Sequence, residues 1–176
     1  MKIVHLTRRF VGTLSLRAPS ADDLAWVDGL LGAELGTQWR RMPNHDQRHA
    51  VGVARAVEAQ LQDTPYGDDP RWLCAALTHD LGKLDARLSV PGRVVATVSA
   101  AAAGHDFADA WSERSGFTRR VGLYLRHPEL GADRIRLAGG PEEAAAWAAA
   151  HHEPERWAST GIPEPVVAAL VAADDD

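Results

Sequence analysis

Residues 72–83 read WLCAALTHDLGK, an apolar run that ends in the adjacent pair His79-Asp80. The run follows Pro70, and proline is tolerated at the first position of a helix because its missing N–H would have no partner there. We therefore expect a buried helix that starts at residue 70, ends at Gly82 in a left-handed cap, and presents His79 and Asp80 at its last turn.

This pair is energetically costly if both side chains are buried. A buried carboxylate beside a buried imidazole loses on the order of several kcal/mol of solvation unless it is paired or bound to a metal. For an isolated His-Asp dipeptide the simpler interpretation is that Asp80 faces solvent and His79 is a hydrogen-bonded core histidine. Here other potential ligands accompany the dipeptide, so a divalent cation is the simplest partner.

Residue types that bind metals recur along the chain. Six of the eight histidines fall at positions that could converge on one centre, namely His45, His49, His79, His127, His151 and His152. Aspartates occupy positions 174–176 directly after the apolar run 166–173, which favours Asp174 as a ligand over a solvated acidic tail. Imidazole nitrogen and carboxylate oxygen suit Mn, Fe, Co, Ni or Zn, whereas Mg and Ca sites consist mainly of oxygen ligands.

The set is too large for one ion, so we expect two divalent transition metal ions. One ion would take most of its ligands from a first set, which is His49, His79, Asp80 and Asp174. The other ion would take its ligands from a second set, which is His127, His151 and His152. Asp80 would bridge the two ions. His151 and His152 would lie about 100° apart on a continuous helix, so both can bind only if the helix ends there. Pro154 indicates that it does.

His45 and Asp46 are open alternatives near His49. His45 lies one helical turn before His49 on the same face, and it could be an extra ligand or a residue behind the ligands. Because His45 lies at the frayed start of the helix expected for residues 45–62, we interpret it as a solvated residue.

The chain resembles the HD-domain metal-dependent phosphohydrolase superfamily. His49, His79-Asp80 and Asp174 match the first histidine, the His-Asp doublet and the last aspartate that define it. The segments HPELG (127–131) and HHE (151–153) are similar to the binuclear branch that includes the HD-GYP cyclic-dinucleotide phosphodiesterases. The resemblance extends from about residue 40 to the end. HD-GYP proteins continue after His-His-Glu with Asp-Gly-x-Gly-Tyr-Pro, whereas residues 154–163 here read PERWASTGIP, and the segment between the doublet and His127 is longer in this chain.

This resemblance implies an enzyme that hydrolyses a phosphate ester, with a small phosphorylated substrate such as a nucleotide. Water activated by the metals would attack phosphorus in line, and Asp80 would hold the metals and receive the proton of the water. In similar proteins a lysine at the position of Lys83 lies near the phosphate, although Lys83 could equally complement the negative end of the helix. Two alternatives stay open: a di-iron oxygenase of the HD type, and a non-catalytic HD module that senses a nucleotide.

Composition narrows the class of protein further. The chain has 176 residues, of which 45% are hydrophobic, as expected for a single domain with a sizeable core. A net charge of −5 argues against a nucleic-acid scaffold, which usually has a basic face. The single cysteine, Cys74, is expected to be a buried, inert thiol. Neither a signal peptide nor a membrane span is recognisable, so we predict a cytoplasmic protein.

The predicted fold is all-α, a compact HD-domain helical bundle over residues 20–176 preceded by an extended arm or hairpin at 1–19. We expect one helix to start at Ser20 and another near residue 141. Between these two we expect a helix that ends at Gly104 and a helix around residues 121–125. The last helix is expected over residues 163–173. We interpret Arg119, Arg120 and Arg126 as a basic edge and as second-choice phosphate contacts after Lys83. Trp157 is expected to pack, with stacking on a base as the alternative.

Overall fold

The computed structural model describes residues 17–89, 91–96 and 107–175. Within these ranges all regular secondary structure is helical, which confirms the predicted all-α class. In chain order the elements are α2 (Ala21–Trp39), α3 (Asn44–Leu61), α4 (Pro70–Thr78), α5 (Lys83–Ala86), α7 (Phe107–Ser112), α8 (Gly116–Leu125), α9 (His127–Leu137), α10 (Glu142–Ala150), the 3₁₀ helix η1 (Pro154–Ser159) and α11 (Glu164–Asp175), and residues 91–96 are also helical.

Several predicted helix boundaries are confirmed. The Ser20 side chain caps α2 by accepting a hydrogen bond from the Asp23 backbone N–H (3.1 Å), as its position before two acidic residues indicated. Helices α3 and α10 begin within one or two residues of the expected positions. The last helix continues to Asp175 instead of ending at residue 173, so Asp174 lies on a helix. The expected arm falls outside the described residues except for 17–19, which have no regular structure.

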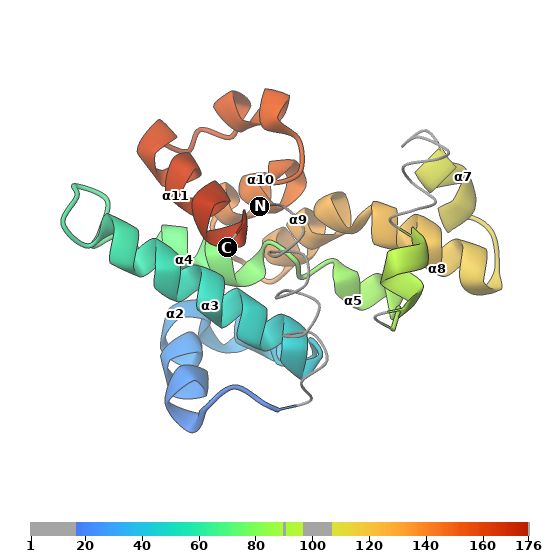
Figure 1. Ribbon diagram of the computed structural model, residues 1–176, viewed down its shortest axis with the longest axis horizontal. Coiled ribbons are helices and arrows are strands. Elements are labelled where there is room, and N and C mark those ends of the chain that lie inside the picture. The colour runs from blue at the N-terminus through green and yellow to red at the C-terminus, as the bar shows by residue number, and fades with distance from the viewer. Residues whose placement is uncertain (1–16, 90, 97–106, 176) are drawn as a thin grey trace.

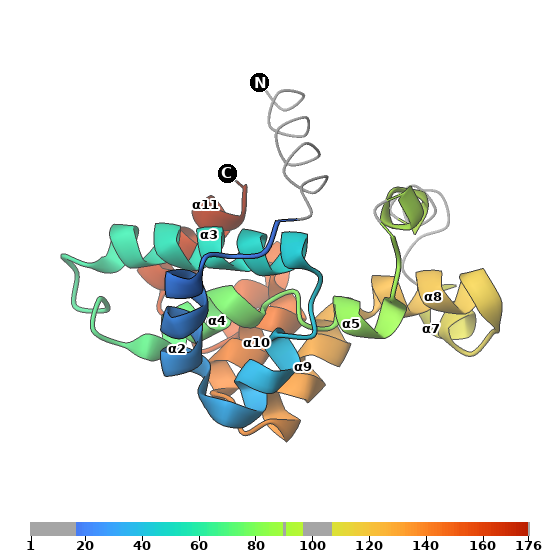
Figure 2. The same ribbon diagram turned by 90° about the horizontal axis from the view of Figure 1, so that it is seen from below.

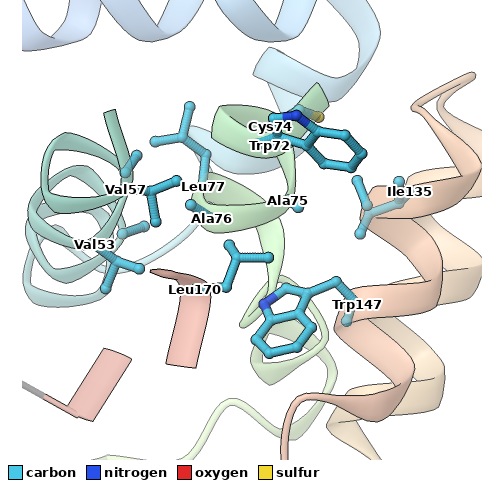
Figure 3. Close-up of a cluster of buried hydrophobic side chains, with 14 of the residues drawn as sticks. Val53, Val57, Trp72, Cys74, Ala75, Ala76, Leu77, Ile135, Trp147 and Leu170 are labelled. Atoms are coloured by element: carbon cyan, nitrogen blue, oxygen red, sulfur yellow. The ribbon is translucent and has the colours of Figure 1, made fainter. Parts of the chain in front are cut away.

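Helix α4 is the centre of the main body of the molecule. Residues 74–78 are each at most 3% exposed, and the helix contacts α2, α3 and α10. Figures 1 and 2 show α3 and α11 packed on one side of α4 and the α9–α10 pair on the other. In Figure 3 the side chains of α4 lie between Val53 and Val57 of α3 and the side chains of Ile135 and Trp147. This packing holds the end of α4, and therefore His79 and Asp80, inside the body.

Small side chains let these helices approach closely. Ala75 and Ala76 of α4 and Ala144, Ala145 and Ala148 of α10 are all 0% exposed. Small side chains at these positions let the backbones of α4 and α10 approach closely, so that the ends of the two helices are also close. The residues that end α4 and α10 consequently lie next to each other.

The end of α4 differs from the prediction at Gly82. The α-helix stops at Thr78, and a tight turn over 79–82 leads into α5. Gly82 has φ −67°, so it is right-handed and does not form the expected left-handed cap. Glycine is needed there for another reason: a Cβ atom would lie 2.0 Å from the backbone carbonyl oxygen of His127. A close backbone contact between the two ligand-bearing segments, and not a turn conformation, explains this residue.

A smaller group of helices projects from the body, and we call it the lobe: α5, residues 91–96, α7 and α8 (Figures 1 and 2). It has its own small core of Ala86, Leu88, Ala96 and Val121, separate from the main hydrophobic cluster. Helix α8 confirms the helix expected around 121–125. Of the helix expected to end at Gly104, residues 91–96 are helical and the rest lies outside the described residues. In the described part of the chain no helix has the length and apolar character needed to cross a membrane.

Candidate metal centre

Two groups of three side chains bring their potential ligand atoms together at the ends of the body helices. In each group the three ligand atoms lie within 4.8 Å of one another. We call them the first triad, which is His49, His79 and Asp174, and the second triad, which is His127, His151 and His152. These are the two sets that the sequence pattern predicted, apart from Asp80, which lies between them.

The first triad joins three helices that are far apart in the sequence. His49 lies in the second turn of α3, His79 follows the last residue of α4, and Asp174 lies in the last turn of α11. The Asp174 Oδ1 atom is 3.0 Å from Nε2 of His49 and 3.6 Å from Nε2 of His79. One carboxylate oxygen thus faces two imidazoles, an arrangement that suits a divalent transition metal.

The second triad consists only of histidines. His127 is the first residue of α9, while His151 and His152 follow the last residue of α10. The ring centroid of His127 is 5.4 Å from that of His151 and 5.2 Å from that of His152. The α-helix stops at Ala150, as Pro154 indicated, although the His151 backbone is still right-handed and its N–H still donates to the carbonyl oxygen of Trp147. The rings of the two adjacent histidines lie side by side, with centroids 3.9 Å apart.

Asp80 lies between the two triads. Its Oδ2 atom is 3.5 Å from Nε2 of His79, and its Oδ1 atom is 3.5 Å from Nε2 of His127 and 3.8 Å from Nε2 of His151. The carboxylate therefore offers one oxygen to each triad. This is the geometry required of a bridging ligand.

Hydrogen bonds define the tautomers of three of these histidines. In His79, His127 and His151 the Nδ1 atom lies 2.7–2.8 Å from the backbone carbonyl oxygen three residues earlier in the chain. A carbonyl oxygen can only accept a hydrogen bond, so each Nδ1 carries the proton. The lone pair is then on Nε2, the atom that faces the centre of the site. This partner on the far nitrogen is the usual way in which proteins orient a metal-binding imidazole.

Several buried polar atoms of these residues have no hydrogen-bond partner among the described residues, and this bears on whether the residues fit a metal. Nε2 of His79, His127 and His151 and Oδ1 of Asp80 are buried, and none has a hydrogen-bond partner among the described residues. Each such atom costs about 1–3 kcal/mol when it is buried without a partner. A cation at each triad would satisfy all four atoms at once, because each presents a lone pair. The donor set therefore fits divalent transition metal ions.

The protonation states also suit metal binding. Burial disfavours the ionised form of Asp80, but the neighbouring Lys83 ammonium holds the pKa of this carboxyl well below its usual range. Burial likewise opposes ionisation of Asp174, and the hydrogen bond from His49 lowers its pKa. Burial holds the pKa of His151 well below its usual value and lowers that of His152 to about 4. At neutral pH these imidazoles are neutral and the carboxylates are charged, as ligands must be.

Lys83 lies directly beside the bridging carboxylate. It is the first residue of α5, and its Nζ atom forms an ion pair with Oδ2 of Asp80. Its side chain is 17% exposed, so it is largely buried. The position agrees with the interpretation of Lys83 as a cation near the metals.

Other residues considered from the sequence lie outside the two triads. His45 faces Asp46, with its Nε2 atom 3.3 Å from Oδ1 of that residue, and its side chain is only 14% exposed. The interpretation of His45 as a solvated residue is therefore wrong, because the start of α3 lies against Arg93 of a distant segment. The candidate basic edge has structural contacts: Arg120 donates to the carbonyl oxygen of Ala86, and Arg126 pairs with Asp109.

Two further side chains behave as the sequence suggested. Trp157 donates from Nε1 to the carbonyl oxygen of Ala150 (3.0 Å) and packs against Trp147, which supports its interpretation as a packing residue that buttresses the end of α10. Cys74 is a buried free thiol, and burial raises its pKa to about 12, as expected for an inert cysteine.

The sequence interpretation missed Arg93. This residue lies in the helical segment 91–96 of the lobe, and its two terminal nitrogens donate to both carboxylate oxygens of Asp46 at 2.7 and 2.6 Å. The contact joins residues 47 positions apart, and no periodic pattern in residues 88–126 marked it. A single sequence contains no pattern that shows that an arginine contacts an aspartate at the start of a distant helix.

No protein-family model, curated protein or solved structure matches this chain. The assignment of function therefore depends on the motif residues and on the geometry described above.

Proposed function

We propose that this protein is a metal-dependent phosphohydrolase of the HD type, which hydrolyses a phosphate ester of a nucleotide with two divalent transition metal ions. The observation that carries the proposal is the pair of triads on either side of Asp80, with buried Nε2 and Oδ1 atoms that have no hydrogen-bond partner among the described residues. The order of the ligands in the sequence matches that of the HD superfamily, and the geometry is consistent with that order.

Each part of the site has a separate task in this proposal. The first triad would hold one ion and the second triad the other, with Asp80 shared between them. Bound divalent ions would supply an activated water and neutralise charge on the phosphoryl oxygens. The carbonyl oxygens that accept from Nδ1 keep the imidazoles oriented without an ion, so the site is preorganised.

Lys83 supports phosphate chemistry in particular. Its ammonium pairs with Asp80, a carboxylate that a bound divalent cation would also attract. Lys83 then has less attraction to Asp80 and can interact with an anionic group of the substrate. The oxygenase interpretation gives this lysine no comparable task, although the same ligands could hold two irons.

The decisive experiment is metal analysis of the purified protein together with assays of p-nitrophenol release. Both a phosphodiester and a phosphomonoester would be tested, with Mn, Fe and Ni added in turn. About two ions per chain with hydrolysis of either ester would support the proposal. Bound iron without hydrolysis would favour the di-iron oxygenase, and a protein without affinity for any of these metals would favour a binding module.

A matched control is available in His45. This histidine lies on the same helix as His49 but outside both triads. The variant His49→Ala is expected to lose metal, whereas His45→Ala is expected to retain it. Equal loss in both variants would contradict the ligand assignment.

A further inference from the structure

An ion pair connects the lobe to the body beside the candidate metal centre. Arg93 binds Asp46 through both terminal nitrogens, and the side chains are only 13% and 7% exposed. A bidentate pair of this kind holds the plane of the guanidinium group in one orientation. Arg93 is therefore a positioned cation and not a mobile surface side chain.

Arg93 and Lys83 share charged and polar neighbours. Arg93 is close enough to Asp80 and Tyr124 for electrostatic interaction, and Lys83 interacts with the same two residues. The Tyr124 ring stacks on His127 of the second triad, with centroids 5.5 Å apart and an interplanar angle of 30°. Two cations from different segments thus lie within electrostatic range of a phenol that stacks on a candidate metal ligand.

His45 completes this group. Its side chain is 14% exposed, and it lies within electrostatic range of both Arg93 and Lys83. Its Nε2 atom is buried and makes no hydrogen bond with good geometry among the described residues, although it lies 3.3 Å from Oδ1 of Asp46. Burial lowers the pKa of His45, so the ring is neutral at neutral pH and can donate one hydrogen bond to an anion.

We propose that Arg93, Lys83 and His45 form an anion subsite beside the metal centre, which binds a second phosphate group next to the one that is hydrolysed. The substrate would then carry two adjacent phosphates, as in a nucleoside diphosphate. Asp46 is a positioning residue, because it acts through Arg93. This inference rests on the proposed function for the identity of the first phosphate, although the subsite itself can be tested without turnover.

The chemistry of the group suits phosphate. A guanidinium has N–H donors in a planar fork that matches phosphate oxygens. The lysine adds a point charge and the imidazole a neutral donor. Asp46 pairs with Arg93 and Asp80 with Lys83, so the two carboxylates lower the net charge of the group.

The test is isothermal titration calorimetry of the full chain loaded with Mn²⁺, with adenosine monophosphate and adenosine diphosphate as probes. The wild-type protein is expected to bind the diphosphate more tightly. Arg93→Gln is expected to weaken diphosphate binding by about tenfold or more, the usual effect of losing a charge-assisted hydrogen bond, and monophosphate binding by less than about twofold. Equal binding of both probes by the wild type, or equal weakening of both in the variant, would overturn the proposal.

Arg134→Gln is a matched control. Arg134 also forms a bidentate pair with an aspartate, Asp85, at 2.8 and 2.7 Å, but it has no contact with the two triads or with Arg93 among the described interactions. Its removal is expected to leave the preference for the diphosphate unchanged. A loss of the preference in Arg134→Gln as large as in Arg93→Gln would mean that general destabilisation explains both results, and would overturn the proposal.

A double variant separates loss of Arg93 from exposure of Asp46. Arg93→Gln alone leaves a buried carboxylate that could repel an anion, whereas Asp46→Asn combined with Arg93→Gln removes both charges. The proposal expects the diphosphate preference to stay lost in the double variant, and its recovery would overturn the subsite. If the p-nitrophenyl esters are not hydrolysed but Arg93 still controls the preference, the proposed function fails while the subsite stands. If the esters are hydrolysed but the preference is absent, the subsite fails while the proposed function stands.

Discussion

In both triads the potential ligand atoms lie within 4.8 Å of one another, but the triads differ in charge and in which of their residues reach solvent. The first triad includes a carboxylate, with the side chains of His49 and Asp174 32% and 23% exposed. The second triad is made of histidines only: the side chains of His127 and His151 are 6% and 1% exposed, whereas His152 is exposed. In the first triad His49 hydrogen-bonds to Asp174, whereas the second triad has no such internal hydrogen bond among the described residues; Nε2 of His79, of His127 and of His151 has no hydrogen-bond partner in the described part of the chain.

If each triad holds an ion, as proposed, the two positions would attract it for different reasons. The carboxylate of the first triad would attract a divalent ion directly, and it accepts a hydrogen bond from His49. The second triad has no carboxylate of its own, so the negative charge that faces it is that of Asp80. Asp80 is therefore the residue on which both positions depend, and substitutions elsewhere should affect one position more than the other.

Asp80→Ala is expected to have the largest effect. Both ions lose their shared ligand and the second triad loses its only charge, so metal content should fall from about two per chain to near zero, and turnover with it. The fold should survive, because the body core does not include this carboxylate. Metal analysis with circular dichroism checks this, and a variant with full metal content would refute the site.

Asp174→Asn and His152→Ala should separate the two positions. Each variant is expected to lose one ion and keep the other, with an affinity loss larger than the roughly 10–100-fold that removal of an outer-shell partner causes. Asp174→Asn also removes a negative charge, so the affinity of the first position for metal should stay low even when metal is added in excess. Competition with a chelator measures both affinities. If either variant loses both ions together, the two positions are not independent.

Gly82→Ala should act on the second triad through the backbone. The new Cβ would lie 2.0 Å from the carbonyl oxygen of His127, so the start of α9 must move. We expect a loss of about 1–3 kcal/mol of stability, as for overpacking, and a melting temperature lower by roughly 2–12 °C. Calorimetry measures this change.

The control for this substitution is Gly52→Ala on α3, where nothing lies within 4 Å of the new Cβ. There the melting temperature should be unchanged or raised, because alanine favours a helix over glycine. A Gly82→Ala protein as stable as the wild type would contradict the close contact between residue 82 and His127.

Lys83→Ala should have the smallest effect on the metals. The ammonium is not a ligand, so both ions should be retained, while turnover of a phosphate ester should fall by about tenfold through loss of a charge-assisted contact. Metal analysis and steady-state kinetics on the same sample test this. Unchanged turnover would assign Lys83 a purely structural role with Asp80, and loss of metal would make it part of the ligand shell.

Much of the fold and of the candidate site was predictable because it depends on local signals. Ser20 before acidic residues marks a helix start, and proline after His152 marks a helix end, since both act through the backbone of their own segment. The ligands were recognisable because histidine and aspartate in apolar segments are rare without a reason. The spatial division into two triads agrees with the division expected from the sequence.

The wrong and missing predictions share one cause, which is contact between distant segments. Gly82 was expected to be a left-handed cap, but it is glycine because the backbone at His127 approaches it from α9. Arg93 was not recognised, because its partner Asp46 lies on α3, 47 residues earlier in the sequence. Local periodicity contains no information on which surfaces meet in space.

The sequence by itself determined the helical class, most helix boundaries and the identity of the candidate ligands, because helix propensity, capping and the cost of burying charge are properties of short segments. Only the tertiary structure decided that Asp80 offers one oxygen to each triad, that His151 and His152 turn to one centre, and that Arg93 comes within electrostatic range of Asp80. Those relations depend on how closely the alanine-rich helices of the body approach and on where the lobe joins it. Both are set by packing between segments far apart in the chain.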